Sequence, residues 1–441
     1  MKRSRFSLLP VLLLLAVLFC QCTAPAKESA VSETNSDTLK GSESETEISS
    51  ADSPDFEDIL WDRDKNQEWV TRNNLPYKNV DGKLPVHNLA VPDELNGASP
   101  IAYSGQKVIF LKSSALEGDT DEQAIYSYDV TNGEMRFLAQ HPPLPFISSG
   151  DYCRVENRLY FYALASENTS EQLALYCLDL SSGELQIVLK ESFTIPMRYL
   201  YAGPANTLFV YSPSKEGEDS YVYRIQKIDL LSGSSKTIYE TRADGKIEIT
   251  TPNIGYSDGR LYAYQRLTSE KTLSNDYIQV LDENGKRLVQ IPFPFGEELV
   301  KANDRSDAIW NLEVFGDYAF VETLSGGGIL TRISSAPSLI AAYNHRAMQI
   351  VKGSQTLRYV VFTDNDKGGL HCLDTKTGEL LKADLDFPND EVDFTHSFSY
   401  GSAVCNEKGD FVLPLAQMNA QGEATYHYFS FTEEELRQEA N

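Results

Sequence analysis

Histidine is the side chain with which this protein could most readily do acid–base or metal chemistry near neutral pH. The six histidines are His87, His141, His345, His371, His396 and His427. No two of them lie within five residues of each other, so the short spacings that bring two imidazoles to one metal are missing. We therefore expect structural roles for the histidines, although a site assembled from distant parts of the chain could still use one.

Two acidic stretches begin like calcium-binding loops. Residues 364–368 (DNDKG) alternate oxygen ligands, but no bidentate glutamate follows at the required distance. Asp62, Asp64 and Asn66 start the same pattern, but Gln67 stands where such a loop needs glycine. The sequence therefore predicts neither a metal site nor a cofactor.

The nucleophilic residues also lack the neighbours that their chemistry needs. There is no G-x-S-x-G motif, and the glycine-rich run Ser325–Gly328 lacks the Lys-Ser/Thr pair of a phosphate-binding loop. Four cysteines in the body of the chain show no C-x-x-C spacing and are expected to be buried thiols: Cys153, Cys177, Cys372 and Cys405. Because no catalytic constellation emerges, the sequence favours a binding protein over an enzyme.

A repeated strand pattern must position these residues. Residues 125–138 read IYSYDVTNGEMRFL, residues 175–188 read LYCLDLSSGELQIV, and residues 370–383 read LHCLDTKTGELLKA. Asp129, Asp179 and Asp229 lie 50 residues apart, and Asp282 follows after 53. Alternating strands with a glycine turn at this period are typical of a propeller blade. We expect each aspartate to cap its turn and each glycine to supply a positive φ.

Tight turns that each precede a β-rich stretch give the number of blades. There are seven such turns: Ser104-Gly105, Glu156-Asn157, Ala205-Asn206, Asp258-Gly259, Gly316-Asp317, Ser354-Gln355 and Lys408-Gly409. We predict an all-β protein with a single β-propeller of seven four-stranded blades, with six or eight blades as alternatives. The last blade lacks an outer strand before a short charged helix at 433–439. We expect the segment Lys83–Val91 to pair with Thr425–Phe431 and close the ring.

The first residues are typical of an export signal. The basic residues Lys2, Arg3 and Arg5 precede the apolar run Leu8–Phe19, which is too short to span a bilayer comfortably. We predict a signal peptide over residues 1–22, an acidic Ser/Thr/Glu-rich disordered tether over 23–58, and an N-terminal segment packing on the body over 59–83. The propeller is expected over 84–436, followed by a tail over 437–441.

Two outcomes of export stay open. Lipidation at Cys22, with Cys20 as the alternative, would anchor the protein in the bacterial cell envelope. Cleavage after Ala26, in the A-x-A sequence 24–26, would instead release a secreted or periplasmic protein. The net charge of −25 argues against a nucleic-acid partner and against docking on anionic lipid, so membrane contact is expected through the lipid anchor alone.

The LDTKTGE segment at 373–379 and its counterparts resemble the repeats of pyrroloquinoline-quinone-type propellers, including the propeller lipoprotein of outer-membrane assembly machinery. They are also similar to TolB-type and surface-layer propeller repeats. The resemblance extends over residues 84–436 and implies the fold without an activity. Quinone-type repeats carry a tryptophan soon after this motif, where this chain has Phe137, Ile187 and Leu381 or Lys382. The Ser-x-Asp-x-Gly-x-Thr-Trp box of sialidase-type propellers is missing as well.

A propeller would bind a ligand at one mouth of its central channel, near the residues that lead into the innermost strands. The candidate ligand-binding residues at these positions are Arg198, Tyr199, Trp310, Asn311 and His396. Our leading hypothesis is an exported, lipid-anchored binding or scaffold module for a protein or glycan, without catalysis. The alternatives are an enzyme of the lactonase or glycan-lyase type, with acid–base residues drawn from several blades, and a sensor module of a transporter or signalling ectodomain.

Overall fold

The computed structural model describes twenty stretches of the chain, all within one compact unit, Asp55–Asn441. These are residues 78–113, 123–143, 152–165, 172–196, 198–216, 220–244, 254–257, 259–265, 277–292, 309–315, 318–323, 328–332, 338–343, 348–350, 359–364, 369–374, 379–388, 397–400, 403–419 and 421–437. The signal peptide, the tether, both lipidation candidates and His396 lie outside them. No helix among these residues is long and apolar enough to cross a membrane.

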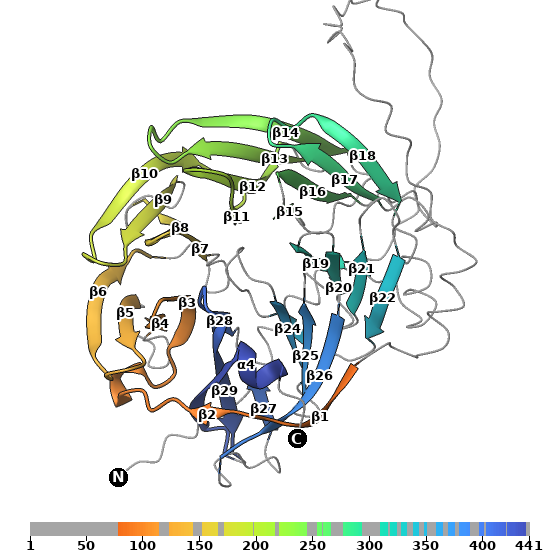
Figure 1. The fold of residues 1–441 in the computed structure, drawn as a ribbon. Helices are drawn as coiled ribbons and strands as arrows, with labels where there is room; N and C mark the ends of the chain where they lie inside the picture. The colour runs from red at the N-terminus through yellow and green to blue at the C-terminus, as the bar shows by residue number, and fades with distance from the viewer. Residues whose placement is uncertain are drawn as a thin grey trace, which may run out of the picture. The chain divides into compact units, whose positions relative to one another are not determined.

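The described strands form seven sheets, each of which is one blade, and Figure 1 shows the blades set around a common centre. Each of the first four blades is a four-stranded antiparallel sheet whose strands follow one another in the chain. Blade one contains β3 (Ser99–Ser104), β4 (Lys107–Ser113), β5 (Gln123–Asp129) and β6 (Met135–His141). Blade two contains β7 (Tyr152–Val155), β8 (Arg158–Leu164), β9 (Gln172–Asp179) and β10 (Leu185–Ser192).

Blades three and four repeat this order. Blade three contains β11 (Tyr199–Ala202), β12 (Thr207–Lys215), β13 (Ser220–Asp229) and β14 (Ser235–Asp244). Blade four contains β15 (Ile254–Ser257), β16 (Arg260–Gln265), β17 (Tyr277–Asp282) and β18 (Arg287–Pro292). The innermost strands of neighbouring blades contact each other from blade seven through blade one to blade five.

The last three blades differ in what lies at their outer edge. Blade five contains β19 (Ile309–Phe315), β20 (Tyr318–Thr323), β21 (Gly328–Arg332) and β22 (Ser338–Tyr343). Blade six contains β23 (Met348–Ile350), β24 (Tyr359–Asp364), β25 (Gly369–Asp374) and β26 (Glu379–Asp386). Blade seven contains β27 (Ser397–Tyr400) and β28 (Val404–Cys405), which both pair with β29 (Asp410–Met418), and then β30 (Ala424–Thr432).

The N-terminal part of the chain adds a fifth strand to blade six and the outer strand to blade seven, as Figure 1 shows. Strand β1 (Lys78–Pro85) pairs in parallel with β26, and β2 (His87–Asn88) pairs antiparallel with β30. The predicted closure of the last blade is therefore confirmed at His87 and Asn88, whereas Lys83–Pro85 of the same predicted segment pairs with blade six instead. A 3-10 turn, η2 (Asp93–Leu95), leads on to β3, and the short helix α4 (Glu433–Arg437) follows β30.

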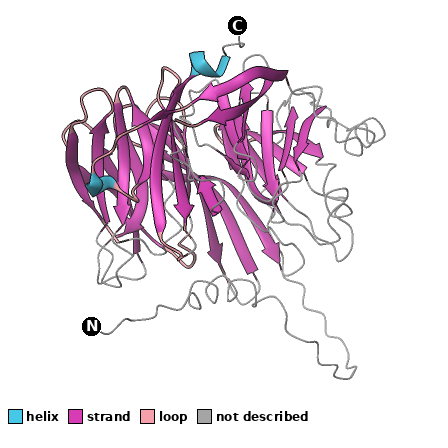
Figure 2. Ribbon diagram, turned by 90° about the horizontal axis from the view of Figure 1, so that it is seen from below, coloured by secondary structure: helices cyan, strands magenta, loops and turns pink. Residues whose placement is uncertain are grey.

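Two faces of the propeller follow from this order, and Figure 2 shows the blades from the side. In blades one to three, tight turns join the first strand to the second and the third to the fourth on one face, which we call the hairpin face. On the opposite face, the crossover face, each fourth strand leads into the first strand of the next blade. All seven β-rich stretches expected from the sequence form second strands (β4, β8, β12, β16, β20, β24 and β29).

The repeated aspartate caps its turn as expected. In blade two, Asp179 Oδ1 accepts hydrogen bonds from the amides of Ser181 and Ser182 at 3.0 and 2.9 Å. These bonds, with the Ser182 amide contributing most, hold the pKa of Asp179 below its ordinary value. Asp129 and Asp229 make equivalent contacts in blades one and three. The aspartate is thus a fold residue that recurs in successive blades.

The glycine of the turn has a second role, which the sequence did not reveal. Gly183 has φ of +80°, and a Cβ placed on it would lie 2.7 Å from the carbonyl oxygen of Leu138 in blade one. Gly233 meets the carbonyl oxygen of Val188 in blade two in the same way, at 2.8 Å. Each turn therefore packs on the outer strand of the preceding blade, where only a residue without a side chain fits.

The cores lie between blades. Phe161 and Leu159 of blade two pack with Ile109 and Ile125 of blade one, and comparable clusters join blades two to three, three to four, six to seven, and seven to one. The described cysteines Cys153, Cys177 and Cys405 are thiols and not disulfides, and the first and last are buried. Successive side chains of a strand face opposite sides of the sheet, so blades one, two, three and seven each contribute to two of these clusters.

Candidate functional site

The predicted ligand-binding residues lie where the innermost strands begin, on the crossover face. Arg198 directly precedes β11, Tyr199 opens it, and Trp310 and Asn311 are the second and third residues of β19. The fold thus brings these positions of blades three and five to the same end of their strands. Their part in ligand binding stays a prediction, as does that of His396.

The Arg198 side chain contacts other residues of the protein. Its side chain is buried, its Nε donates to Glu191 Oε1 at 2.5 Å, and its Nη1 donates to the carbonyl oxygen of Ile195 at 2.8 Å. The guanidinium also lies 5.8 Å from the centre of the Tyr162 ring, a cation–π distance. Since Glu191 belongs to β10, the outermost strand of blade two, the guanidinium reaches outward between blades two and three. It fixes the crossover between them.

A second polar cluster on the crossover face joins blades one and two. The imidazole of His141, the last residue of β6, is 3% exposed and stacks on Phe161 with ring centres 4.6 Å apart. Its Nδ1 lies 2.5 Å from the carbonyl oxygen of Pro142, so this nitrogen is the donor and Nε2 accepts from the Tyr152 hydroxyl at 3.1 Å.

Burial lowers the pKa of His141 to about 4, although the contact with the Pro142 carbonyl opposes the shift. The ring is therefore neutral at physiological pH and holds the crossover against the start of β7. This arrangement agrees with the structural role expected for the histidines. The residues that His141 contacts lie up to 20 positions away, so motif spacing gave no sign of the cluster.

On the hairpin face, charged residues connect three blades at the inner rim. Arg154 of β7 forms an ion pair with Glu407, which lies in the turn between β28 and β29, and its Nη1 donates to Ser104 Oγ at 2.8 Å. The amide of Gly105 donates to Glu407 Oε2 at 3.1 Å. Although burial alone would raise it, these bonds hold the pKa of Glu407 below its ordinary value. The hairpin-face network (Ser104, Arg154 and Glu407) thus ties blade seven to blades one and two.

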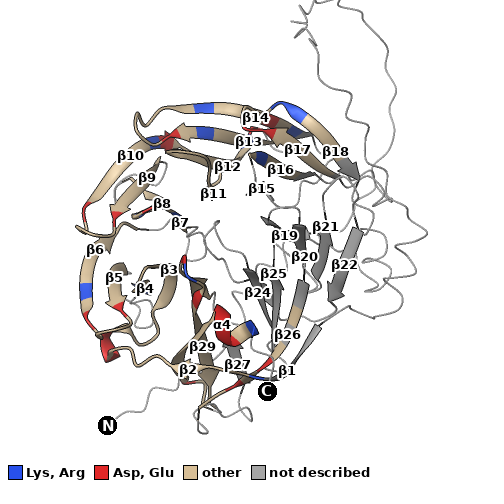
Figure 3. Cartoon of the chain, viewed as in Figure 1, with Lys and Arg blue, Asp and Glu red and all other residues tan. Residues whose placement is uncertain are grey.

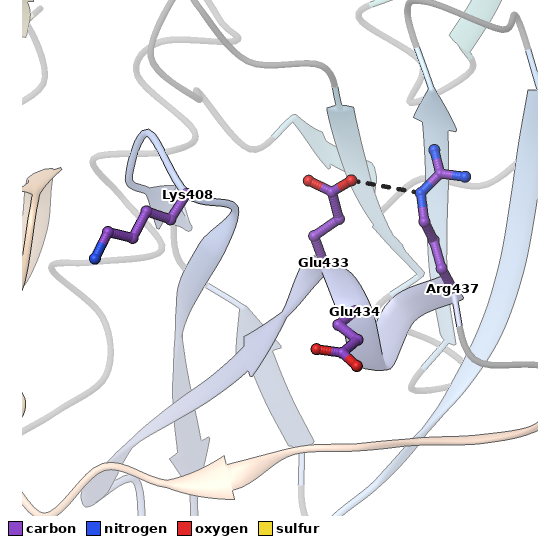
Figure 4. Close-up of a pocket in the computed structure, with 4 residues that line it drawn as sticks. All are labelled: Lys408, Glu433, Glu434 and Arg437. Carbon is purple, nitrogen blue, oxygen red and sulfur yellow. Dashed lines mark ion pairs between the residues drawn. The ribbon is translucent and has the colours of Figure 1, made fainter.

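A hollow near the C-terminus is lined by charges of both signs. Figure 4 shows the lining residues: Lys408, from the turn before β29, whose side chain points away from α4, and the α4 residues Glu433, Glu434 and Arg437. Arg437 Nε lies 3.5 Å from Glu433 Oε1. Two acids and two bases leave the hollow without a preferred sign of ligand charge. In the part of the chain that the structure describes, no cluster of His, Cys, Asp or Glu could hold a metal ion.

The outer wall of blades one to three carries exposed apolar side chains. Phe137 on β6 is 52% exposed and Ile187 on β10 is 43% exposed. Both stand eight residues after the repeated aspartate, so they occupy the same slot in consecutive blades. Leu231, 76% exposed, lies in the β13–β14 turn that Gly233 places against Val188, the neighbour of Ile187. We call these three residues the outer-wall row.

The strands beneath the row present an open edge. Strands β6, β10 and β14 are the last strands of their sheets in the described topology, and Figure 3 marks the positions of basic and acidic residues along their ribbons. Next to the row, Arg136 donates to the carbonyl oxygens of Ser181 and Ser182 at 2.7 and 2.8 Å, which fixes one blade against the next. The apolar side chains therefore stand on a rigid base.

These features define the class of the protein as a β-propeller. No protein-family model matches the sequence, and a search of curated proteins finds no match. Among solved structures, an oligogalacturonate lyase from Vibrio parahaemolyticus is similar over 79% of this chain and 94% of its own, with 11% identity and a TM-score of 0.48. The propeller domain of the Trilobed protease from Pyrococcus furiosus covers 78% of this chain and 98% of its own, with 10% identity and a TM-score of 0.47.

The acylaminoacyl peptidase of Pyrococcus horikoshii is also similar, over 78% of this chain and 53% of the peptidase, with 10% identity and a TM-score of 0.49. Identities this low concern the fold alone. The propeller assignment itself rests on the seven sheets and their order in the chain.

Proposed function

We propose that this protein is a non-catalytic binding or scaffold module that holds a protein or glycan partner on the outer wall of blades one to three. The outer-wall row carries this proposal. Single exposed apolar residues are ordinary, but Phe137 and Ile187 recur at the same repeat position on neighbouring blades, and Leu231 lies in the turn that docks beside Ile187. Exposed aromatic and aliphatic side chains on a rigid base are what a partner's apolar surface can bury with little loss of entropy.

The proposal includes the expected place of the protein in the cell. Export, lipidation at Cys22 and an acidic tether over residues 23–58 would hold the propeller some distance from the membrane while leaving it free to turn toward a partner. A Cys22→Ala variant should lose both the lipid, detected by mass spectrometry of the membrane fraction, and membrane association. If lipid is retained in that variant, Cys20 becomes the anchor, and if no lipid is found on either protein, cleavage after Ala26 is supported.

The test of the binding surface is crosslinking in intact cells with the full chain as bait. The triple variant Phe137→Ser, Ile187→Ser and Leu231→Ser should lose the partner captured by the wild-type protein. Its stability should change by less than about 1 kcal/mol, since exposed side chains contribute little to folding. Met418→Ser is the matched control, because Met418 is 38% exposed but lies at the end of β29 in blade seven.

The enzyme alternative makes the opposite prediction. A channel-mouth site would be impaired by Tyr199→Phe or Asn311→Ala and unaffected by changes to the outer-wall row. Capture of the same partner by wild type and triple variant alike would therefore refute the proposed surface. Loss of capture in the triple variant, with the Met418 control unchanged, would support it.

A further inference from the structure

The outer edges of the blades are of two kinds. In blades one to five the pairing between the third and fourth strands shifts by one residue, which is a β-bulge. The bulged residues are Leu138, Val188 and Ile238, each nine residues after the repeated aspartate, and Leu288 and Ile340, which lie nearer the start of their strands. In blade six, β25 and β26 pair without any shift from Gly369–Asp384 to Asp374–Glu379.

The bulge makes an outer edge unsuitable for a further strand. It interrupts the regular row of amides and carbonyls that another strand would need, and it twists the edge away from a straight partner. In blades one and two, the bulged residues Leu138 and Val188 also receive the turn glycine of the next blade. These edges are thus interrupted at the same point at which the next blade docks.

Blade six has the regular edge, and a strand is seated on it. Strand β1 pairs in parallel with β26, from Lys78 opposite Leu381 to Pro85 opposite Asp386. On the inner side, Leu84 is 3% exposed and joins a core cluster with Leu381 and Leu385. Val86, also 3% exposed, follows directly and extends the same cluster.

Strand β1 is poorly suited to the edge that it occupies. It pairs at Lys78, Asn79 and Lys83–Pro85, and its register breaks over the three residues between them. That break contains Asp81 and Gly82, and the strand ends at Pro85, all residue types that are depleted in strands. The ion pair of Lys83 Nζ with Asp386 Oδ1, at 3.6 Å, joins side chains that are 65% and 59% exposed, so it holds the strand only weakly.

We infer that the outer edge of β26 is a strand-acceptor site, and that β1 occupies it as a displaceable strand of the same chain. The ligand is an extended segment of a partner protein that runs parallel to β26, with apolar side chains at the positions of Leu84 and Val86. Main-chain hydrogen bonds to the regular edge would give affinity, and the two apolar positions would give specificity. A second copy of this chain is a poor ligand, because its own β1 carries the same break and gains nothing by exchange.

The probe is a fluorescent peptide with the sequence of residues 78–86 carrying Asp81→Thr, Gly82→Val and Pro85→Thr, which removes the residues that weaken β1. Binding to the full-length protein is measured by fluorescence anisotropy, with a scrambled peptide of the same composition as the negative control. In a Leu84→Ala protein, the resident strand loses its main apolar anchor, so the peptide should bind at least about tenfold more tightly than to wild type.

A reversible lock provides the decisive control. Lys83 and Asp384 are cross-strand partners with exposed side chains, so Lys83→Cys with Asp384→Cys can join β1 to β26 by a disulfide. The oxidised protein should lose peptide binding at least tenfold, and reduction should restore it. Equal binding to the oxidised and reduced forms would overturn the inference, and so would the absence of specific binding to both wild type and the Leu84→Ala protein.

The orientation of the bound peptide gives an independent readout. A photo-crosslinker on its first residue should label the protein around Leu381, where β1 begins its pairing, and a crosslinker on its last residue should label around Asp386. Labels in the reverse order would show an antiparallel peptide and would overturn the assigned site. Loss of the outer-wall row leaves this edge unchanged, so this result is separate from the proposed function.

Discussion

The packing of each turn glycine on the preceding blade predicts that two similar glycines differ strongly in their tolerance of alanine. Gly133 and Gly183 occupy the same place in the repeat and have φ of +72° and +80°. A Cβ on Gly133 would meet only the Tyr128 hydroxyl, at 3.8 Å. A Cβ on Gly183 would lie 2.7 Å from Leu138 O, 0.7 Å closer than the 3.4 Å at which ordinary contact begins.

The expected magnitudes follow from these distances. Gly133→Ala forces a side chain into the left-handed region, which costs about 1 kcal/mol of the free energy of unfolding. Gly183→Ala has that cost and must also push the turn of blade two away from the outer strand of blade one. Overpacking of this kind costs a further ~1–3 kcal/mol, because the group that the Cβ meets is a backbone carbonyl of β6, which its sheet holds in place.

The assay is urea unfolding of both variants beside the wild-type protein, with the free energy of unfolding taken from the linear dependence on urea. Gly183→Ala should lose at least about 1 kcal/mol more than Gly133→Ala. Equal losses would refute the reasoning, because positive φ alone would then explain the glycine and the blades would not be docked at this point.

Three further results are expected. Because burial lowers the pKa of His141 to about 4, the unfolded chain binds more protons than the folded one between pH 6.5 and 4. Stability should fall by about 3 kcal/mol as pH decreases through that window, and His141→Gln should flatten the urea-midpoint profile across it. Thr432 caps α4: its hydroxyl accepts from the Glu435 amide, and Glu435 Oε2 accepts from the Thr432 amide at 2.8 Å. Thr432→Ala should therefore lower the free energy of unfolding by about 1 kcal/mol and speed amide hydrogen exchange in α4. Unchanged exchange would argue against the cap. Arg154→Ala should lower the free energy of unfolding by about 1 kcal/mol in dilute buffer and by less in 1 M NaCl, because its partner Glu407 is partly exposed and salt screens the pair. A loss of stability that does not depend on salt would contradict an ionic contribution.

Local sequence rules were enough to predict the elements of the propeller. The Asp-turn-Gly pattern uses short-range physics: a carboxylate accepting amides two and three residues onward, and a glycine that tolerates positive φ. For that reason the turns at Asp129, Asp179 and Asp229 could be predicted without the structure. Closure by the N-terminal segment was also predicted, because a blade that lacks its outer strand leaves an edge that some other segment must cover.

The sequence pattern was not enough to place the third strand of blade five. This strand, β21, begins at Gly328, the last residue of the glycine-rich run, and it ends at Arg332, where the other repeats have aspartate. The pattern of alternating residues alone did not fix the register, because a degenerate repeat has no aspartate to mark the turn.

The sequence by itself determined that the chain folds as a propeller, since strand alternation and turn chemistry act over a few residues. Only the tertiary structure decided what happens between blades. Leu138 and Gly183 are 45 residues apart, Arg154 and Glu407 are 253 apart, and Arg198 of blade three pairs with Glu191 of blade two. Such contacts depend on how twisted sheets pack against one another, which no short-range spacing records. The same packing decides which outer edges are bulged and leaves that of blade six regular for a strand.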